Sequence, residues 1–121
     1  MTTPRQRLGA FGEDLAVRRL HELGYRIVQR NYRCPVGEID IVAMDGETMA
    51  LVEVRTRRGE RMGTPEESIG PRKRAKMIEV AQTYVAETGY AGPWRLDVVV
   101  VALGPGGRVE RCEVIPNAVG E

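Results

Sequence analysis

Three acidic residues stand at spacings that could bring their carboxylates together. Glu38 and Asp40 lie two residues apart in an apolar segment, and Glu53 follows in the next apolar segment. Residues two apart on a β-strand share a face, so Glu38 and Asp40 should share one face, as Glu53 should with Arg55. Between the segments, Asp45-Gly46 is a strong hairpin signal. The pattern predicts two antiparallel strands with acidic side chains on one face.

The register of this hairpin decides which acids meet. A four-residue loop over residues 45–48 pairs Met44 with Met49. Counted back along both strands, this register pairs Asp40 with Glu53, and Glu38 with Arg55. A two-residue loop shifts the pairing by two and keeps the same faces, whereas an odd-length loop or a bulge would change them. Asp40 and Glu53 should therefore lie side by side.

Two like charges directly opposed across strands are destabilising, so something must offset the repulsion between Asp40 and Glu53. A hard divalent cation such as Mg²⁺ takes carboxylate oxygens and would do so. A raised pKa on one acid, or a structural network with Arg55 and Glu38, would do so too. The residues alone leave the metal site and the ion network open as alternatives.

Hydrophobic periodicity predicts the elements around the hairpin. An apolar stripe at helical spacing predicts a helix from about Arg5 to Leu23, ended by Gly24. A second helix should begin at Pro71 and end at Gly89, after a charged loop over residues 58–65. The stripe of the first helix consists of Leu8, Phe11, Leu15, Ala16, Leu20 and Leu23. The predicted strands are Tyr25–Arg30, Glu38–Met44, Thr48–Arg57, Trp94–Leu103 and Arg108–Ile115, the last at an edge.

This order, α-β-β-β-α-β-β, predicts an α/β fold with a mixed central sheet flanked by helices. The third strand, the second helix and the Trp94–Leu103 strand form a β-α-β unit, so those two strands should be parallel. The latter strand is almost continuously apolar, which predicts burial on both faces. An unpaired charge there would be costly, so Asp97 should pair with Arg95 or another arginine. The 121 residues fit one domain, residues 1–121.

Composition narrows the function classes. No apolar run approaches the roughly 20 residues of a membrane span, and the N-terminus lacks the apolar stretch of a signal peptide. Cys34 and Cys112 make no disulfide framework, so a cytoplasmic location is expected, and the single His21 argues against a His/Cys zinc site. Eight of the 18 basic residues fall within residues 55–76. That excess could face phosphates or form a solvated surface.

The order of these residues resembles a nuclease signature. Glu13 on the first helix, then Asp40, then Glu53-Val54-Arg55 resembles the PD-(D/E)xK pattern, and the predicted αβββαβ core is similar to that of restriction-endonuclease-like nucleases. The spacing resembles that of archaeal Holliday-junction resolvases. A nearer resemblance, over most of the chain, is to the YraN-like family of uncharacterised bacterial proteins. It is carried by Gly12-Glu13, Gly24-Tyr25, Arg30-Asn31-Tyr32-Arg33, Gly37-Glu38-Ile39-Asp40, Val52-Glu53-Val54-Arg55-Thr56-Arg57, Gly63-Thr64-Pro65, Lys73 and Arg95-Leu96-Asp97-Val98-Val99.

The resemblance implies an Mg²⁺- or Mn²⁺-dependent DNA endonuclease of repair or recombination, with branched or single-stranded DNA as candidate substrates. Asp40, Glu53 and the backbone carbonyl of Val54 would be metal ligands, and Glu13 would reach the site from the helix, directly or through water. The metal would activate a water and neutralise developing charge on the phosphate. Because cutting two strands takes two sites, the resemblance also suggests a homodimer.

Arg55 departs from the superfamily pattern, which usually has lysine at that position. Arginine stays protonated and cannot act as a base, although it can orient water or hold phosphate. Lys73 could take the missing catalytic role. The substitution leaves two alternatives to the nuclease: a non-catalytic nucleic-acid-binding protein with the same fold, or a structural role with the acids locked into arginine pairs. The candidate phosphate contacts are Arg30, Arg33, Arg57, Arg58, Arg61 and Lys73. Tyr25, Tyr32 and Trp94 could stack on bases, but core packing is the favoured interpretation for each.

Overall fold

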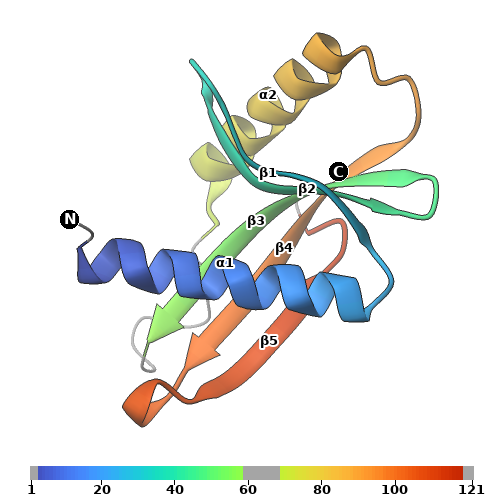
Figure 1. Ribbon diagram of the computed structural model, residues 1–121. Coiled ribbons are helices and arrows are strands. Elements are labelled where there is room, and N and C mark those ends of the chain that lie inside the picture. Colours follow the sequence, from blue (N-terminus) through green and yellow to red (C-terminus); the bar gives the residue numbers. More distant parts are fainter. Residues whose placement is uncertain (1–2, 59–68, 119–121) are drawn as a thin grey trace.

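A computed structural model describes residues 3–58 and 69–118 of the chain. The elements follow the predicted order, with one short 3₁₀ helix added (Figure 1). They are α1 (Pro4–Glu22), β1 (Arg26–Cys34), β2 (Gly37–Asp45), β3 (Thr48–Arg58), α2 (Pro71–Thr88), β4 (Trp94–Leu103), η2 (Pro105–Gly107) and β5 (Val109–Ile115). Most of the predicted loop over residues 58–65, and Arg61 within it, lies outside the described residues.

The strands form one five-stranded sheet in the order β1-β2-β3-β4-β5. β3 and β4 are parallel, and the other neighbouring pairs are antiparallel. The parallel pair requires a crossover, which α2 provides. The prediction of a mixed α/β fold is confirmed, and the order is compatible with an αβββαβ core. β5 lies at the edge of the sheet, as its sequence predicted.

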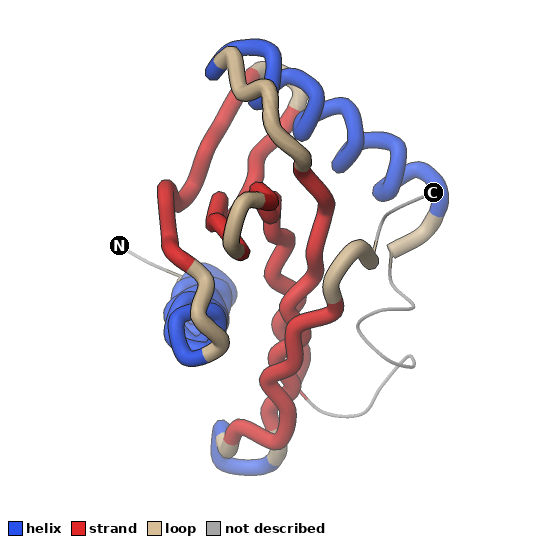
Figure 2. The backbone as a smooth tube through the Cα atoms, turned by 90° about the vertical axis from the view of Figure 1, so that its right-hand side faces the viewer, coloured by secondary structure: helices blue, strands red, loops and turns tan. Residues whose placement is uncertain are grey.

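The two long helices cover opposite faces of the sheet (Figure 2). On one face, Ala16 and Leu20 of α1 pack with Ile41, Val52 and Val99. On the other, a second cluster joins α2 to the sheet, and it includes Met77, Val80, Tyr84, Leu51 and Val98. Neighbouring valines of β4 belong to different clusters, so this strand is buried on both faces, which confirms the prediction from its apolar sequence.

Local sequence fixes where the helices begin and end. Thr3 caps α1 in a capping box with Gln6, and Pro4 occupies the first helical turn, where a missing N–H costs nothing. Gly24 follows α1 with φ 94°, and Gly89 ends α2 with φ 69°, a conformation that glycine adopts without a Cβ penalty. Neither α-helix in the described part of the chain has an apolar stretch of the length that a membrane crossing requires.

Two details differ from the predictions. β1 continues past Arg30 to Cys34 and pairs there with Gly37. The predicted strand ended too early because residues 31–34 carry only one buried apolar side chain, Tyr32, and so give little strand signal. Phe11 and Leu23 were expected on the buried stripe of α1, but they are 44% and 47% exposed. The stripe is narrower than predicted because α1 packs on the sheet chiefly through Ala16 and Leu20.

Candidate active site

The candidate site lies where β2 separates from β3. The ladder between these strands includes Met44 opposite Met49, as the sequence predicted, and runs to Ile41 opposite Val52. It stops there, so the predicted ladder pairs of Asp40 with Glu53 and of Glu38 with Arg55 do not form. Instead, Oδ2 of Asp40 accepts a 2.8 Å hydrogen bond from the backbone N–H of Val54. In β2, Glu38 faces Arg33 of β1, with 3.3 Å between Arg33 Nε and Glu38 Oε2.

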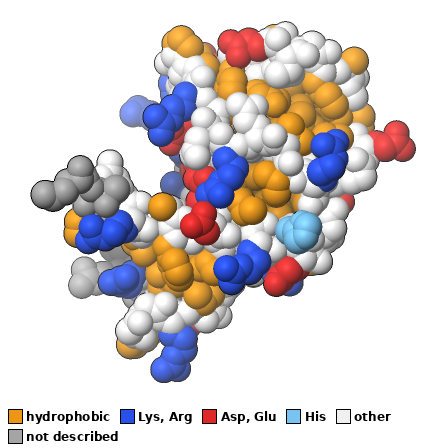
Figure 3. Space-filling model, in the orientation of Figure 1, with side chains coloured by type: hydrophobic (Ala, Val, Ile, Leu, Met, Phe, Trp, Pro, Cys, Tyr) orange, Lys and Arg blue, Asp and Glu red, His pale blue; other side chains and the backbone are white. Residues whose placement is uncertain are grey.

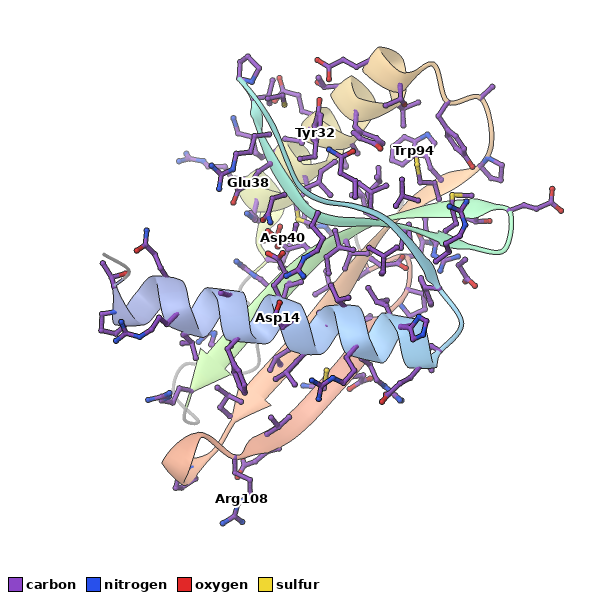
Figure 4. All side chains as sticks on the ribbon, in the orientation of Figure 1. Asp14, Tyr32, Glu38, Asp40, Trp94 and Arg108 are labelled. Atoms are coloured by element: carbon purple, nitrogen blue, oxygen red, sulfur yellow. The ribbon has the colours of Figure 1, made fainter. Side chains whose placement is uncertain are left out.

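Asp40 is the electrostatic centre of this region. Its pKa is raised to about 7, first by burial and then by repulsion from Glu53, with smaller contributions from Glu13 and Glu38. The hydrogen bond from Val54 acts in the opposite direction, because it stabilises the charged carboxylate. Glu53 and Glu13 therefore lie close enough to Asp40 to raise its pKa. In Figure 4, Asp40 lies between the strands and α1, on the side toward which Asp14 points.

Glu13 reaches this region from α1 and is held there by β1. Its Oε1 accepts hydrogen bonds from Arg30 Nε at 2.9 Å and from Asn31 Nδ2 at 3.3 Å. Arg30 also pairs with Asp14 of the next helical position, at 2.8 Å. Asn31 has φ 57°, a left-handed conformation that non-glycine residues seldom adopt and that often marks functional sites. Arg30, predicted as a phosphate contact, is thus engaged by two carboxylates and fixes Glu13.

The close approach of α1 to β3 depends on Gly12, a residue to which the sequence patterns assigned no role. A Cβ atom built at Gly12 would lie 1.9 Å from Oγ1 of Thr56, far inside contact distance. A helix residue with any side chain here would be pushed away from β3. Gly12 therefore allows α1 to bring the neighbouring Glu13 toward Asp40.

Glu53 is contacted by two cations from different elements. Nζ of Lys73 lies 3.3 Å from its Oε2, and Nη1 of Arg55 lies 3.6 Å from the same atom. The Glu53 side chain is only 12% exposed, so these charges interact in a partly water-excluded environment. Lys73, near the start of α2, thus lies beside the acid-any-arginine segment of β3.

Glu13, Asp40 and Arg55 border a hollow of about 660 Å³ between α1 and the first three strands; Glu53 and Lys73 are not among its lining residues. Figure 3 shows Lys and Arg side chains next to a few acidic ones where this face of the molecule is indented. Of the predicted phosphate contacts, Arg30, Arg33 and Arg57 line the hollow, together with Arg55. Arg58 lines a separate hollow. The charged residues that line the 660 Å³ hollow are Glu13, Arg30, Arg33, Glu38, Asp40, Arg55 and Arg57.

The donor atoms suit a hard cation. Asp40 and Glu53 offer carboxylate oxygens, and the intervening β3 backbone offers the carbonyl of Val54. Mg²⁺ is commonly held by one or two carboxylates, with water and substrate phosphate completing its shell. Within residues 3–58 and 69–118, no three His, Cys, Asp or Glu side chains stand close enough to hold a metal ion together. A cation here would therefore be bound by two protein carboxylates, those of Asp40 and Glu53, while Glu13 stays paired with Arg30.

The remaining predicted residues are structural. Asp97 is fully buried and accepts hydrogen bonds from Arg95 Nε at 2.9 Å and from the backbone N–H of Asn117 at 2.8 Å. This confirms the predicted pairing. The buried Tyr25 hydroxyl accepts a 2.8 Å bond from Arg95, and buried Tyr32 packs edge-to-face on Tyr84. Trp94 packs against the core cluster on the α2 side, so these aromatic rings do not form a surface for bases.

Comparison with known proteins finds bacterial relatives that match most of this chain and most of their own length. The profile of the uncharacterised protein family UPF0102 matches residues 12–101. A UPF0102 protein of Moorella thermoacetica is 49% identical over 119 residues, which cover 98% of this chain and 99% of the relative. One from Symbiobacterium thermophilum is 46% identical over 114 residues (93% and 96%). One from Nocardia farcinica is 48% identical over 107 residues (86% and 83%). The segment matched by the family profile spans the positions of Glu13, Asp40, Glu53, Arg55 and Lys73.

Proposed function

The chain belongs to the UPF0102 family of uncharacterised proteins, and we propose that its domain is a metal-dependent nuclease that hydrolyses phosphodiester bonds in DNA. The observation that carries the proposal is the half-buried Asp40, placed within electrostatic range of Glu53 and Glu13 and on the border of a hollow lined by arginines. A bound metal cation would neutralise the clustered acids, and a phosphate group would neutralise the clustered cationic side chains.

Mg²⁺ or Mn²⁺ would be held by the carboxylates of Asp40 and Glu53 and by the backbone carbonyl of Val54. When bound, such a cation lowers the pKa of a coordinated water and offsets the charge that develops on the phosphate. Glu13 would act as an outer acceptor for water, because Arg30 and Asn31 fix its carboxylate. A fixed acceptor orients the attacking water without the entropy cost of ordering a free side chain.

Arg55 and Lys73 divide the work that a single lysine has in the usual signature. Arg55 carries a permanent charge and two parallel donors, so it suits the phosphate. Lys73 is the neighbouring group that can change its protonation state, and its Nζ lies 3.3 Å from Glu53. The proposed roles are phosphate clamp for Arg55 and proton-transfer partner for Lys73.

The start of α2 supports a polyanionic substrate. Its first turn and a half carries Arg72, Lys73, Arg74 and Lys76, and its first turn has no acid. Cations at a helix N-terminus oppose the helix dipole and cost stability. The N-cap Gly70 also leaves the first backbone N–H groups without a side-chain acceptor. Phosphate groups would offset both costs.

Cleavage of labelled DNA tests the proposal. The substrates would be a linear duplex, a flap and a four-way junction, each with Mn²⁺ and with EDTA. We expect metal-dependent cutting that is lost in Asp40→Asn/Glu53→Gln. Glu47→Gln is the matched control, because Glu47 is an exposed acid in the turn between β2 and β3 and does not line the hollow. Equal cutting by the double variant and the wild type would assign the activity to a contaminant and refute the proposal.

Arg55 favours one alternative, a nucleic-acid-binding protein that keeps the fold without catalysis. Such a protein would bind DNA equally in EDTA and in Mn²⁺. Its affinity would fall steeply with salt, because binding releases counterions from the phosphates. It would cut none of the three substrates.

A further inference from the structure

A second hollow lies on the other side of α1, between its N-terminal half and the turn that joins β4 to β5. Its volume is about 650 Å³, within the roughly 300–1,000 Å³ typical of ligand pockets. Phe11 lines it, and Leu103 forms part of its apolar wall. It is lined by Pro4, Arg7, Leu8, Phe11, Arg58, Leu103 and Gly107.

Phe11 is the only phenylalanine of the chain, and its ring is 44% exposed. Leaving a ring in water forgoes much of the favourable free energy of burying it. The neighbouring apolar residues of α1 are more buried: Leu8 and Leu15 are partly covered, and Ala16 is fully covered. The ring therefore presents a flat apolar surface that residues 3–58 and 69–118 leave partly uncovered.

The charged residues of this hollow favour an anionic ligand. Its charged lining residues are two exposed arginines, Arg7 and Arg58, and no acid is among the described residues that line it. An apolar ring that shares a hollow with two guanidinium groups matches a molecule that is flat and apolar at one point and anionic at the next. An unpaired nucleobase with its flanking phosphates has that chemistry, since bases stack on aromatic rings while arginines bind phosphate.

We propose that this hollow binds an unpaired nucleobase of a single-stranded segment attached to the substrate. The inference rests on the proposed function and specifies its substrate class, a duplex with a single-stranded overhang or flap. Phe11 would be a specificity-determining residue that stacks on the base. Arg7 and Arg58 would contact the phosphates beside it.

The position of the hollow relative to the acid site sets the length of the overhang. Leu8 lines both hollows, so they adjoin across the N-terminal half of α1. Phe11 and Glu13 are two residues apart, which places them about 200° apart around the helix and about 10–12 Å across it. A single strand would have to pass round the helix to join the two hollows. The stacked base should therefore lie a few nucleotides from the phosphate at the acid site.

Binding measured in EDTA separates this inference from catalysis. Fluorescence anisotropy would compare a blunt duplex with the same duplex carrying single-stranded overhangs of one to six thymidines. For the wild type, affinity should rise once the overhang is long enough to reach Phe11, at a length within this series. Phe11→Ala should weaken overhang binding by about 5- to 150-fold, the range for one stacked base, and leave blunt-duplex binding unchanged.

Three further variants distinguish stacking from apolar contact and from misfolding. Phe11→Leu keeps an apolar side chain without a π-face and should behave like Phe11→Ala. Phe11→Trp should retain overhang binding, and its added fluorescence should be quenched by the overhang. Leu23→Ala, which removes a 47% exposed apolar side chain at the other end of α1, should change nothing.

Equal overhang affinity in the wild type and Phe11→Ala would overturn the inference, as would an effect of Phe11→Ala on self-association alone in sedimentation. DNA cleavage unaffected by these variants would leave the proposed nuclease intact while removing this subsite. Conversely, overhang binding that depends on Phe11, without cleavage of any substrate, would keep the subsite and reject the nuclease.

Discussion

The carboxylate of Asp40 accepts a 2.8 Å hydrogen bond from the backbone N–H of Val54, so a side chain closes the gap where β2 leaves β3. This contact ties the proposed metal ligand to the backbone of the segment that carries Glu53. It also contributes to the partial burial of the Asp40 carboxylate. The site is thus part of the sheet, and changes to it should be visible in stability as well as in activity.

Stability of the metal-free protein should depend on pH through Asp40. Its folded pKa is about 7, whereas in the unfolded chain it is about 4. Between these values the folded protein binds more protons than the unfolded chain, so Asp40 destabilises the protein increasingly as pH rises from about 4 to 7. Asp40→Asn, which keeps a carbonyl acceptor for Val54, should remove this dependence. Urea denaturation in EDTA at pH 5 and pH 8 measures it.

The expected difference between wild type and Asp40→Asn is a few kcal/mol between the two pH values, since one pKa unit corresponds to about 1.4 kcal/mol. Asp14→Asn serves as the control, because that acid is exposed and should leave the wild-type pH dependence in place. Parallel pH curves for wild type and Asp40→Asn would mean that Asp40 is ionised in the folded protein well below pH 7.

Divalent cations should stabilise the fold if Asp40 and Glu53 bind them. A ligand at 100 times its Kd adds about 2.7 kcal/mol to the free energy of unfolding. For a domain of this size that stabilisation corresponds to a rise of roughly 5–15 °C in the melting temperature. Calorimetry with Mn²⁺ at pH 7 should show the rise, and Asp40→Asn/Glu53→Gln should abolish it. An equal rise in both proteins would place the cation elsewhere.

Gly12→Ala should weaken both the fold and the site. The added methyl would meet Thr56 Oγ1, and overpacking of this kind typically costs about 1–3 kcal/mol. Moving α1 outward would also withdraw Glu13, so DNA cleavage should fall more than DNA binding. Gly9→Ala is the control, because a Cβ there meets nothing within 4 Å and should stabilise the helix by about 0.5–1 kcal/mol.

Rescue would confirm the cause. In Gly12→Ala/Thr56→Ala the hydroxyl that clashes is gone, so the free energy of unfolding and the cleavage rate should both recover in part. A Gly12→Ala protein as stable and active as wild type would show that α1 tolerates a wider separation from β3.

Sequence patterns predicted the elements and the region of the site because both depend on local rules. The alternation of side chains along the two strands predicted that Asp40 and Glu53 lie near each other. Pro71 and Gly89 marked the limits of α2. The patterns could not predict that β2 and β3 part at Asp40, because strand divergence depends on the twist of the whole sheet. They also missed the hold of Arg30 on Glu13 and the exposure of Phe11, since both depend on how α1 lies across the strands.

The division of roles between Lys73 and Arg55 can be tested by exchanging the two residue types. Lys73→Arg keeps the positive charge beside Glu53 but cannot take up or release a proton at working pH. It should retain DNA binding and lose cleavage by about a hundredfold or more, the scale of a missing proton-transfer group. Arg55→Lys restores the usual signature residue, so it should retain or raise cleavage. Single-turnover cleavage rates and DNA affinities in EDTA measure the two effects separately. The reverse result, with full activity in Lys73→Arg and none in Arg55→Lys, would make Lys73 a structural partner of Glu53 and Arg55 the residue on which the reaction depends.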